Sequence, residues 1–178
     1  MAHKDEVTPL QQDSYRKEGY EMNDKSFMQE AIDLARENVA KGGQPFGAVL
    51  VRDGKVLVRA VNRMEADNDP TAHAELVALR EAGAALASTR LDGCTVYASG
   101  QPCPMCLAAM RNAGISEIVI GYSDGSGTPY GLGTAAAFAA LSQPLDAQDW
   151  AKIRYAAPED AAAPGIYEAW TAKSSDEK

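Results

Sequence analysis

Residues 68–76, NDPTAHAEL, combine a break in the chain with two chemically active side chains. His73 and Glu75 lie two positions apart at the start of an Ala- and Leu-rich segment that is typical of a helix. Inside a helix, residues i and i+2 point to nearly opposite sides, so a shared site normally needs a spacing of three or four. Because Pro70 and Thr71 break the chain just ahead, we expect both residues in the first helical turn, where they can lean over one point.

A second short stretch, residues 102–106, reads PCPMC and places two thiols at i and i+3. Pro104 suits the first turn of a helix, and the positive end of that helix favours thiolates. Cys103 and Cys106 would then lie on one side of the helix. Taken alone, the pair fits either a metal site or a thioredoxin-like redox pair, and two buried cysteines are the purely structural alternative.

His73 favours the metal interpretation. One histidine and two cysteines form a zinc ligand set that leaves the fourth tetrahedral position open for water, whose pKa zinc can lower to about 7. A structural zinc needs a fourth protein ligand, for which Cys94 in a predicted core strand and His3 near the N-terminus are poorly placed. Most helical glutamates are simply solvated, but Glu75 would be suited to move the proton of such a water. The sequence therefore predicts a catalytic zinc.

Composition and charge limit the class of protein. The 178 residues are 46% hydrophobic and 24% charged, as in one soluble globular domain. No apolar run reaches the ~20 residues of a membrane span and the N-terminus is unlike a signal peptide, so we expect a cytoplasmic protein. Three cysteines without a secretion signal argue against a disulfide framework. The net charge of −8 argues against nucleic acid as a partner and favours a small neutral or cationic substrate.

The hydrophobic pattern predicts alternating helices and strands. A polar arm over 1–22 precedes a helix over 24–41, and two β-branched runs joined at Asp53 and Gly54 predict a hairpin. Further elements are expected as helices at 72–86, 104–113 and 134–141, strands at 94–99 and 116–122, an edge strand at 151–156, and a terminal helix or arm at 165–170. This order predicts a mixed sheet covered by helices in one domain over 23–178.

The motifs together resemble those of a known enzyme superfamily. H-x-E followed by P-C-x-x-C is the signature of zinc deaminases. PFGAVLV, NDPTAHAEL and PCPMC occur in matching order, so the chain is identified as a member of the cytidine deaminase superfamily over roughly residues 25–122. It is most similar to bacterial guanine deaminases and tRNA adenosine deaminases, because pyrimidine nucleoside deaminases usually have Gly in place of Pro104. The resemblance implies a three-layer α/β/α sandwich with a central mixed five-stranded sheet, and a homodimer.

The resemblance also implies roles for single residues. The zinc ligands would be His73, Cys103 and Cys106, and the proton shuttle would be Glu75. The substrate contacts would be Asn62 as a hydrogen-bond partner of the base, Phe46 packed on the ring, the backbone of Ala74 at the substrate's edge, and Asp124 as the one acid near the acidic contact of guanine deaminases. The terminal YEAW resembles an aromatic segment that closes over the base, so residues 164–178 are expected to cover an active site, in the same or a partner subunit.

Two departures from the family keep the substrate open. Gln101 stands where the family often has Glu, and the loop over 123–133 differs from that of guanine deaminases. Since this glycine-rich loop lacks the phosphate-binding pattern, we interpret it as a pocket rim with Tyr130 as a candidate contact. Guanine is the expected substrate. Another heterocycle (cytosine, isocytosine or a triazine) and tRNA adenosine remain alternatives, and a non-enzymatic zinc module would leave Glu75 unexplained.

Overall fold

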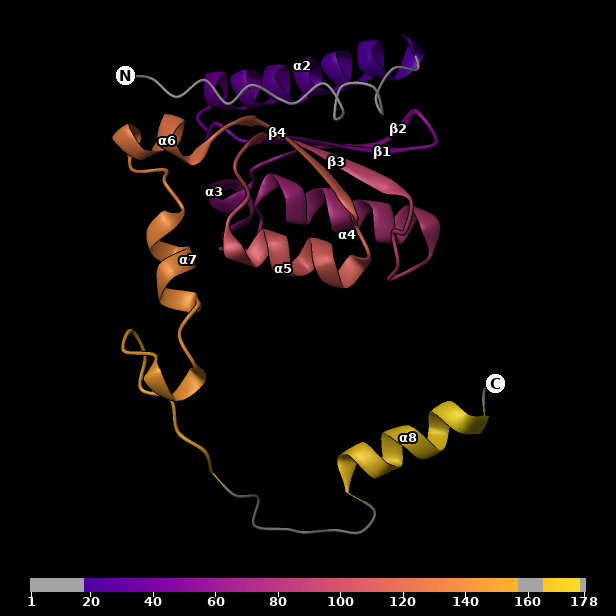
Figure 1. The fold of residues 1–178 in the computed structure, drawn as a ribbon, viewed down its shortest axis with the longest axis vertical. Helices are drawn as coiled ribbons and strands as arrows, with labels where there is room; N and C mark the ends of the chain where they lie inside the picture. Colours follow the sequence, from indigo (N-terminus) through magenta and orange to yellow (C-terminus); the bar gives the residue numbers. More distant parts are fainter. Residues whose placement is uncertain (1–17, 157–164, 177–178) are drawn as a thin grey trace. The chain divides into compact units, whose positions relative to one another are not determined.

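The computed structural model describes residues 18–156 and 165–176 (Figure 1). The chain divides into two compact units, Met1–Ser142 and Gln143–Lys178. The expected arm over 1–22 falls mostly outside the described residues, and the domain boundaries drawn from the sequence stay a prediction. Among the described helices, none combines the length and apolar character that a membrane crossing requires.

The first unit contains the elements that the sequence pattern predicted, with shifted ends, and it adds short helices over 64–67, 124–127 and 128–130, where loops were expected. Its helices and strands are α2 (Glu18–Ala40), β1 (Gly47–Arg52), β2 (Lys55–Val61), α3 (Met64–Asp67), α4 (Ala74–Leu86), β3 (Cys94–Gly100), α5 (Pro104–Ala113), β4 (Glu117–Tyr122), α6 (Asp124–Gly127), η1 (Thr128–Tyr130) and α7 (Ala135–Leu141). The predicted hairpin turn is confirmed, because Asp53 and Gly54 both adopt the positive φ that a tight hairpin turn demands.

Four strands form one mixed sheet in the order β2-β1-β3-β4. β1 pairs antiparallel with β2 and β3, whereas β3 and β4 run parallel. Helix α2 covers one face, and α4 and α5 cover the other (Figure 1). The expected mixed sheet between two layers of helices is therefore confirmed, but the expected count of five strands is wrong for the described residues. The predicted edge strand at 151–156 is irregular, because alternating side chains favour a strand only where a neighbouring edge pairs with it.

The two central strands hold the core. Both β1 and β3 are buried along nearly their whole length, as expected for strands covered on two faces. Leu50, Val96 and Met110 belong to the cluster under α4 and α5, while Val49 and Tyr97 belong to the cluster under α2. The sheet thus provides a rigid base on which the loops at its ends can position functional side chains.

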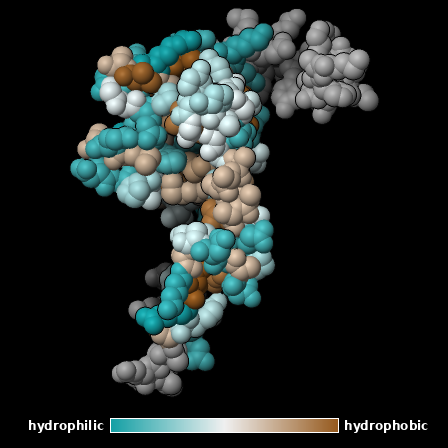
Figure 2. Space-filling view, turned by 90° about the vertical axis from the view of Figure 1, so that its left-hand side faces the viewer, coloured by the Kyte–Doolittle hydropathy of each residue, from teal (hydrophilic) through white to brown (hydrophobic). Residues whose placement is uncertain are grey.

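The second unit contains η2 (Leu145–Ala147) and α8 (Ile166–Asp176). The helix α8 confirms the helical alternative for the terminal segment. Several large side chains of this unit are exposed, namely Leu145, Trp150, Ile153, Tyr155, Ile166, Tyr167 and Trp170. Figure 2 shows hydrophobic residues in small groups among hydrophilic ones on the face it presents.

Candidate metal centre and substrate pocket

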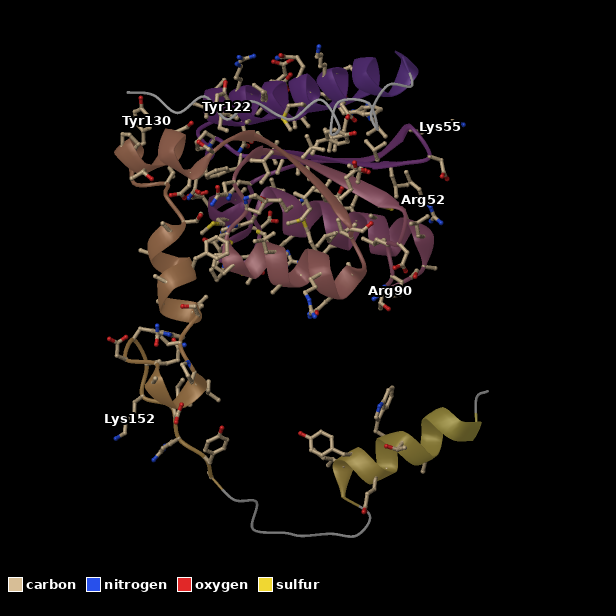
Figure 3. The ribbon with its side chains drawn as sticks, in the orientation of Figure 1. Arg52, Lys55, Arg90, Tyr122, Tyr130 and Lys152 are labelled. Carbon is tan, nitrogen blue, oxygen red and sulfur yellow. The ribbon has the colours of Figure 1, made fainter. Side chains whose placement is uncertain are left out.

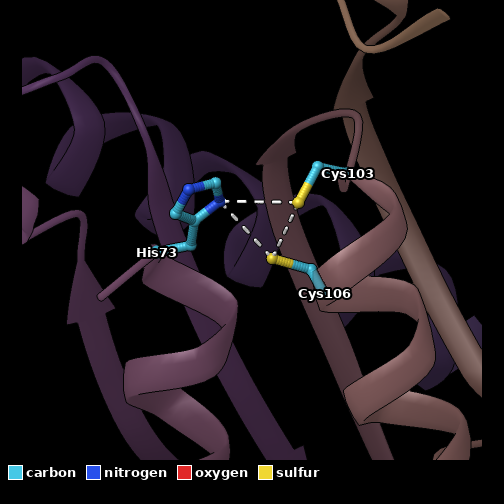
Figure 4. A group of neighbouring side chains, drawn as sticks. All are labelled: His73, Cys103 and Cys106. Atoms are coloured by element: carbon cyan, nitrogen blue, oxygen red, sulfur yellow. Dashed lines mark hydrogen bonds between the residues drawn. The ribbon is translucent and has the colours of Figure 1, made fainter. Parts of the chain in front are cut away.

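Two helix starts hold the predicted metal ligands. His73 is the N-cap of α4 and Cys103 the N-cap of α5, and both have extended backbones. The expectation that His73 lies inside the first turn is therefore corrected, since the helix begins at Ala74. This difference explains the spacing of two in H-x-E, because only Glu75 belongs to the helix. Figure 4 shows the three side chains converging from these two helices.

The three candidate ligand atoms form a nearly equilateral triangle. His73 Nδ1 lies 3.6 Å from the Sγ atoms of both Cys103 and Cys106, and the two sulfurs are 3.6 Å apart. Tetrahedral zinc with bonds of about 2.0–2.1 Å to nitrogen and about 2.3 Å to sulfur needs donor separations of about 3.5–3.8 Å. The donor set and its geometry therefore fit zinc, and they form a metal-ligand cluster among the described residues.

The protons of the triad are shared unequally. A hydrogen bond from Cys106 is the main reason why the pKa of the Cys103 thiol falls to about 4. The same contact raises the pKa of Cys106, and the contact with Cys103 raises the pKa of His73. Before a metal binds, Cys103 would thus be a thiolate beside the protonated thiol of Cys106. Because zinc binds thiolates and neutral imidazole, metal uptake must displace protons from this cluster.

Glu75 is a buried carboxyl beside the triad. It lies in the first turn of α4 with 6% of its surface exposed, and its Oε2 is 3.5 Å from the sulfur of Cys106. Burial is the main cause that raises the pKa of the Glu75 carboxyl. A carboxyl in this position can exchange protons with a group held next to the three ligands.

Asn62 carries a buried side-chain amide. Its side chain is almost fully buried, and its Oδ1 accepts a hydrogen bond from the backbone N–H of Met64 at 3.1 Å. Asn38 donates to the Asn62 carbonyl at 2.9 Å and so fixes the backbone. Within the described residues, the Asn62 Nδ2 has no hydrogen-bond partner. Since such an orphan costs about 1–3 kcal/mol when buried, it is a candidate contact for a ligand.

A pocket of about 450 Å³ lies in the first unit, and its lining includes neither the three candidate ligands nor Glu75. It is lined by Ile32, Ala35, Arg36, Val39, Pro45, Phe46, Ser99, Gly100, Gln101, Tyr122, Ser123, Asp124, Ser126, Gly127, Tyr130 and Leu132. Phe46 packs closely on Gly100, where a Cβ would approach the ring to 3.1 Å. Of the predicted substrate contacts, the pocket includes Phe46 and Asp124 but not Asn62 or Ala74, which is buried at the start of α4.

The predicted rim residues have different surroundings. Tyr130 lines the pocket and is 80% exposed at the tip of the loop (Figure 3). The carboxylate of Asp124 instead accepts hydrogen bonds from Thr134 and Thr128 within its own loop. These hydrogen bonds lower the pKa of the Asp124 carboxyl, and the largest contribution comes from the backbone N–H of Thr134. The structure thus places Asp124 at the pocket with its oxygen atoms already engaged.

The sequence interpretation missed a network that supports His73. Asp69 accepts hydrogen bonds from the backbone N–H and the hydroxyl of Thr71 at 2.8 and 2.7 Å. Arg80 donates to Asp69 at 3.3 Å and to the Thr71 hydroxyl at 2.5 Å, while the backbone N–H of His73 donates to the Thr71 carbonyl. The D-P-T turn was the available signal, because Asp often accepts from the N–H two residues ahead.

Comparison with known proteins agrees with this geometry. The family described as the cytidine and deoxycytidylate deaminase zinc-binding region matches residues 21–122, more than half of the chain. Guanine deaminase from Bacillus subtilis is 48% identical over 90 residues, which are 50% of this chain and 58% of that protein. Its crystal structure superposes with a TM-score of 0.76 and 32% identity, covering 83% of this chain and 93% of the other.

Deaminases that act on tRNA are similar as well. The tRNA-specific adenosine deaminase of Bacillus subtilis is 40% identical over 104 residues, which are 58% of this chain and 65% of that protein. A structure from a study of A-to-I editing by tRNA:A34 deaminases has a TM-score of 0.58 and 38% identity, covering 68% of this chain and 90% of the other. The matches thus span less than two thirds of these two curated relatives' sequences. The chain belongs to the cytidine and deoxycytidylate deaminase family and carries its zinc-binding region.

Proposed function

We propose that this protein is a zinc-dependent hydrolytic deaminase of a free nucleobase, with guanine as the substrate and xanthine and ammonia as the products. The observation that carries the proposal is a three-ligand triad with the buried carboxyl of Glu75 beside it. Three protein ligands are typical of catalytic zinc, which activates a water at neutral pH when bound. A structural zinc would need a fourth protein ligand.

Glu75 would move the protons of the reaction. It would accept a proton from the attacking water and deliver protons to the ring nitrogen and the departing amine, so that water and the aminated base become the oxo base and ammonia. Burial supports this double role, because it raises the pKa of the carboxyl toward the working pH.

Three residues would hold the base. The unpartnered Nδ2 of Asn62 can donate a hydrogen bond to an acceptor atom of the ring. Phe46 can pack against a planar heterocycle, and the resemblance to the family assigns the backbone of Ala74, at the start of α4, to the substrate's edge. The pocket that Phe46 lines has a volume of about 450 Å³, which is in the range of small-molecule sites, about 300–1,000 Å³.

The extent of the structural match favours a free base over tRNA. Guanine deaminase superposes on 83% of this chain, the tRNA:A34 deaminase structure on 68%. The net charge of −8 is also unfavourable for a polyanion. The basic residues Arg52, Lys55 and Arg90 lie at the opposite end of the first unit from Tyr130 (Figure 3).

Another small heterocycle is the second candidate. The carboxylate of Asp124 is engaged within its own loop, which favours a substrate that needs no acidic contact at this position. The resemblance further suggests a cytoplasmic homodimer in which residues 164–178 close over an active site. The exposed aromatic residues Tyr167 and Trp170 of α8 are suited to such a covering role.

Ammonia release from a panel of free bases, nucleosides and tRNA tests the proposal. We expect guanine to have the highest kcat/KM. The Glu75→Ala and Glu75→Gln variants should keep their zinc, measured by elemental analysis, and lose at least about a thousand-fold in kcat. Glu81→Ala, which removes an exposed carboxyl on the same helix, is the matched control. Wild-type turnover by Glu75→Ala would disprove the proton-transfer role, and preference for tRNA would disprove the substrate.

A further inference from the structure

The side chain of Gln101 connects the segment before α5, the helix that contains Cys106, to the glycine-rich loop over 123–134. Gln101 lies two residues before Cys103, and its Oε1 accepts a hydrogen bond from the backbone N–H of Asp124 at 3.2 Å. Its Nε2 donates to the hydroxyl of Thr134 at 3.3 Å. Both functional groups of the amide are therefore used, one at the beginning of the loop and one at its end.

The contacts continue into the carboxylate of Asp124. The hydroxyl of Thr134 donates to Asp124 Oδ1 at 2.8 Å, and the backbone N–H of Thr134 donates to the same oxygen. Thr128 donates to Oδ2 at 3.3 Å. These hydrogen bonds can all form at once. The amide of Gln101 donates to the hydroxyl oxygen of Thr134, and that hydroxyl donates its single proton to the carboxylate of Asp124. We call this group of Gln101, Asp124 and Thr134 the loop clasp.

The loop held by the clasp is one wall of the 450 Å³ pocket. Five of its other residues line that pocket, namely Ser123, Ser126, Gly127, Tyr130 and Leu132, together with Gln101 itself. Four glycines lie between positions 124 and 134, so the loop has little intrinsic stiffness. The position of the loop at the pocket therefore depends on the hydrogen bonds between its two ends.

We propose that Gln101 is a positioning residue for substrate specificity, because it fixes the pocket-lining loop relative to α5. This inference rests on the proposed function for its link to substrate. It also gives a physical reason for glutamine at this position. A glutamate would lose the donor to Thr134 and bring a second carboxylate next to that of Asp124, which would weaken the clasp.

Steady-state kinetics of Gln101→Glu test the specificity role. We expect KM to rise about ten-fold with kcat within about two-fold, because the wall contributes to binding rather than to proton transfer. Removing the repulsion should rescue the variant, so Gln101→Glu combined with Asp124→Asn should recover at least half of the loss on a logarithmic scale. Gln29→Glu is the matched control, since it likewise places a new carboxylate beside an aspartate, Asp33, but on the exposed face of α2.

Hydrogen exchange of the loop amides tests the clasp without any turnover. In the zinc-loaded protein, the amides of 124–134 should exchange at least about five-fold faster in Gln101→Glu than in wild type or Gln29→Glu, with equal zinc content. Unchanged exchange would overturn the clasp. Faster exchange with an unchanged KM would overturn the role in specificity. A wild-type protein that deaminates nothing in the panel would disprove the proposed function. The exchange result would still show whether Gln101 holds the loop in place.

Discussion

Protonation of three side chains controls whether the centre can hold its metal. Cys103 is already a thiolate at neutral pH, because its pKa is about 4, whereas the pKa values of Cys106 and His73 are raised in the metal-free triad. Zinc would compete with protons for these two groups. The protonation of these side chains therefore sets the pH range in which the centre can bind zinc. Beside them, burial raises the pKa of the Glu75 carboxyl and so favours its protonated form.

We predict that zinc is lost progressively as the pH falls below neutrality. Lower pH protonates the imidazole and the thiols, so the apparent zinc affinity should decrease, and zinc uptake by the metal-free protein at pH 7 should release protons. A competing chromophoric chelator at several pH values measures the affinity, and a pH dye in weak buffer measures the release. A zinc affinity that does not change between pH 5 and 8 would contradict this assignment of ligands.

We also predict that Arg80 affects how long zinc stays bound. Its guanidinium holds Asp69 and Thr71, which shape the turn before His73. Because partners that orient a metal ligand affect metal affinity, Arg80→Ala should lose zinc to a chelator about two- to ten-fold faster. Arg36→Ala, which removes an exposed arginine with a similar ion pair on α2, should match wild type. Equal rates for all three proteins would disprove the effect.

At the scale of elements, close contact between α2 and β1 depends on the absence of a side chain. A Cβ on Gly47 would collide with the carbonyl of Ala31 and come within 2.9 Å of the Ala35 nitrogen, both on the backbone of α2. The backbone N–H of Gly47 also donates to the buried Ser99 hydroxyl at 3.0 Å. Helix and strand therefore pack at a distance that only glycine allows.

We predict that Gly47→Ala lowers the free energy of unfolding by about 2–3 kcal/mol, because the backbone of α2 must move away from the sheet. Denaturant unfolding of the zinc-loaded protein measures the change. Gly125→Ala is the control, since a Cβ there meets only the Ser123 hydroxyl at 3.9 Å, and it should change stability by less than about 0.5 kcal/mol. A Gly47→Ala protein as stable as this control would show that the contact can relax freely.

At the scale of the whole molecule, the metal site and the aromatic terminal segment belong to different units. All three metal ligands and the 450 Å³ pocket lie in Met1–Ser142, which has its own sheet and core. The exposed Tyr167 and Trp170 lie in Gln143–Lys178. If the proposed covering role holds, one unit binds the metal and the other covers the bound substrate.

We predict that a chain ending at Ser142 still folds and binds one zinc, because its core and ligands are complete. Its kcat/KM for the base should fall at least about ten-fold if the terminal segment excludes water from the site. Trp170→Ala in the full chain should show a smaller loss in the same direction with normal zinc content. Circular dichroism, elemental analysis and ammonia release measure these outcomes, and full activity of the shortened chain would disprove the covering role.

Local patterns in the sequence were sufficient for the longer helices and strands of the first unit and for the candidate metal ligands. The hairpin turn, the central strands and the residues of the triad depend on short-range preferences and on donor chemistry, which are present in consecutive residues. The expected fifth strand at 151–156 was wrong for the described residues, since a strand forms only by pairing with another segment, and the alternation within 151–156 does not specify that partner. The start of α4 was placed two residues early, because capping geometry is a property of the folded backbone.

By itself, the stretch 68–76 together with PCPMC predicted which residues are the candidate metal ligands, because zinc chemistry depends on residue type and spacing. Only the tertiary structure decided how those atoms meet, with His73 and Cys103 as extended N-caps whose donors lie 3.6 Å apart. It also showed that Asp124 is engaged by Thr134 and that Gln101 completes this clasp. Those contacts join residues far apart in the chain, and chain folding alone brings them within hydrogen-bonding distance.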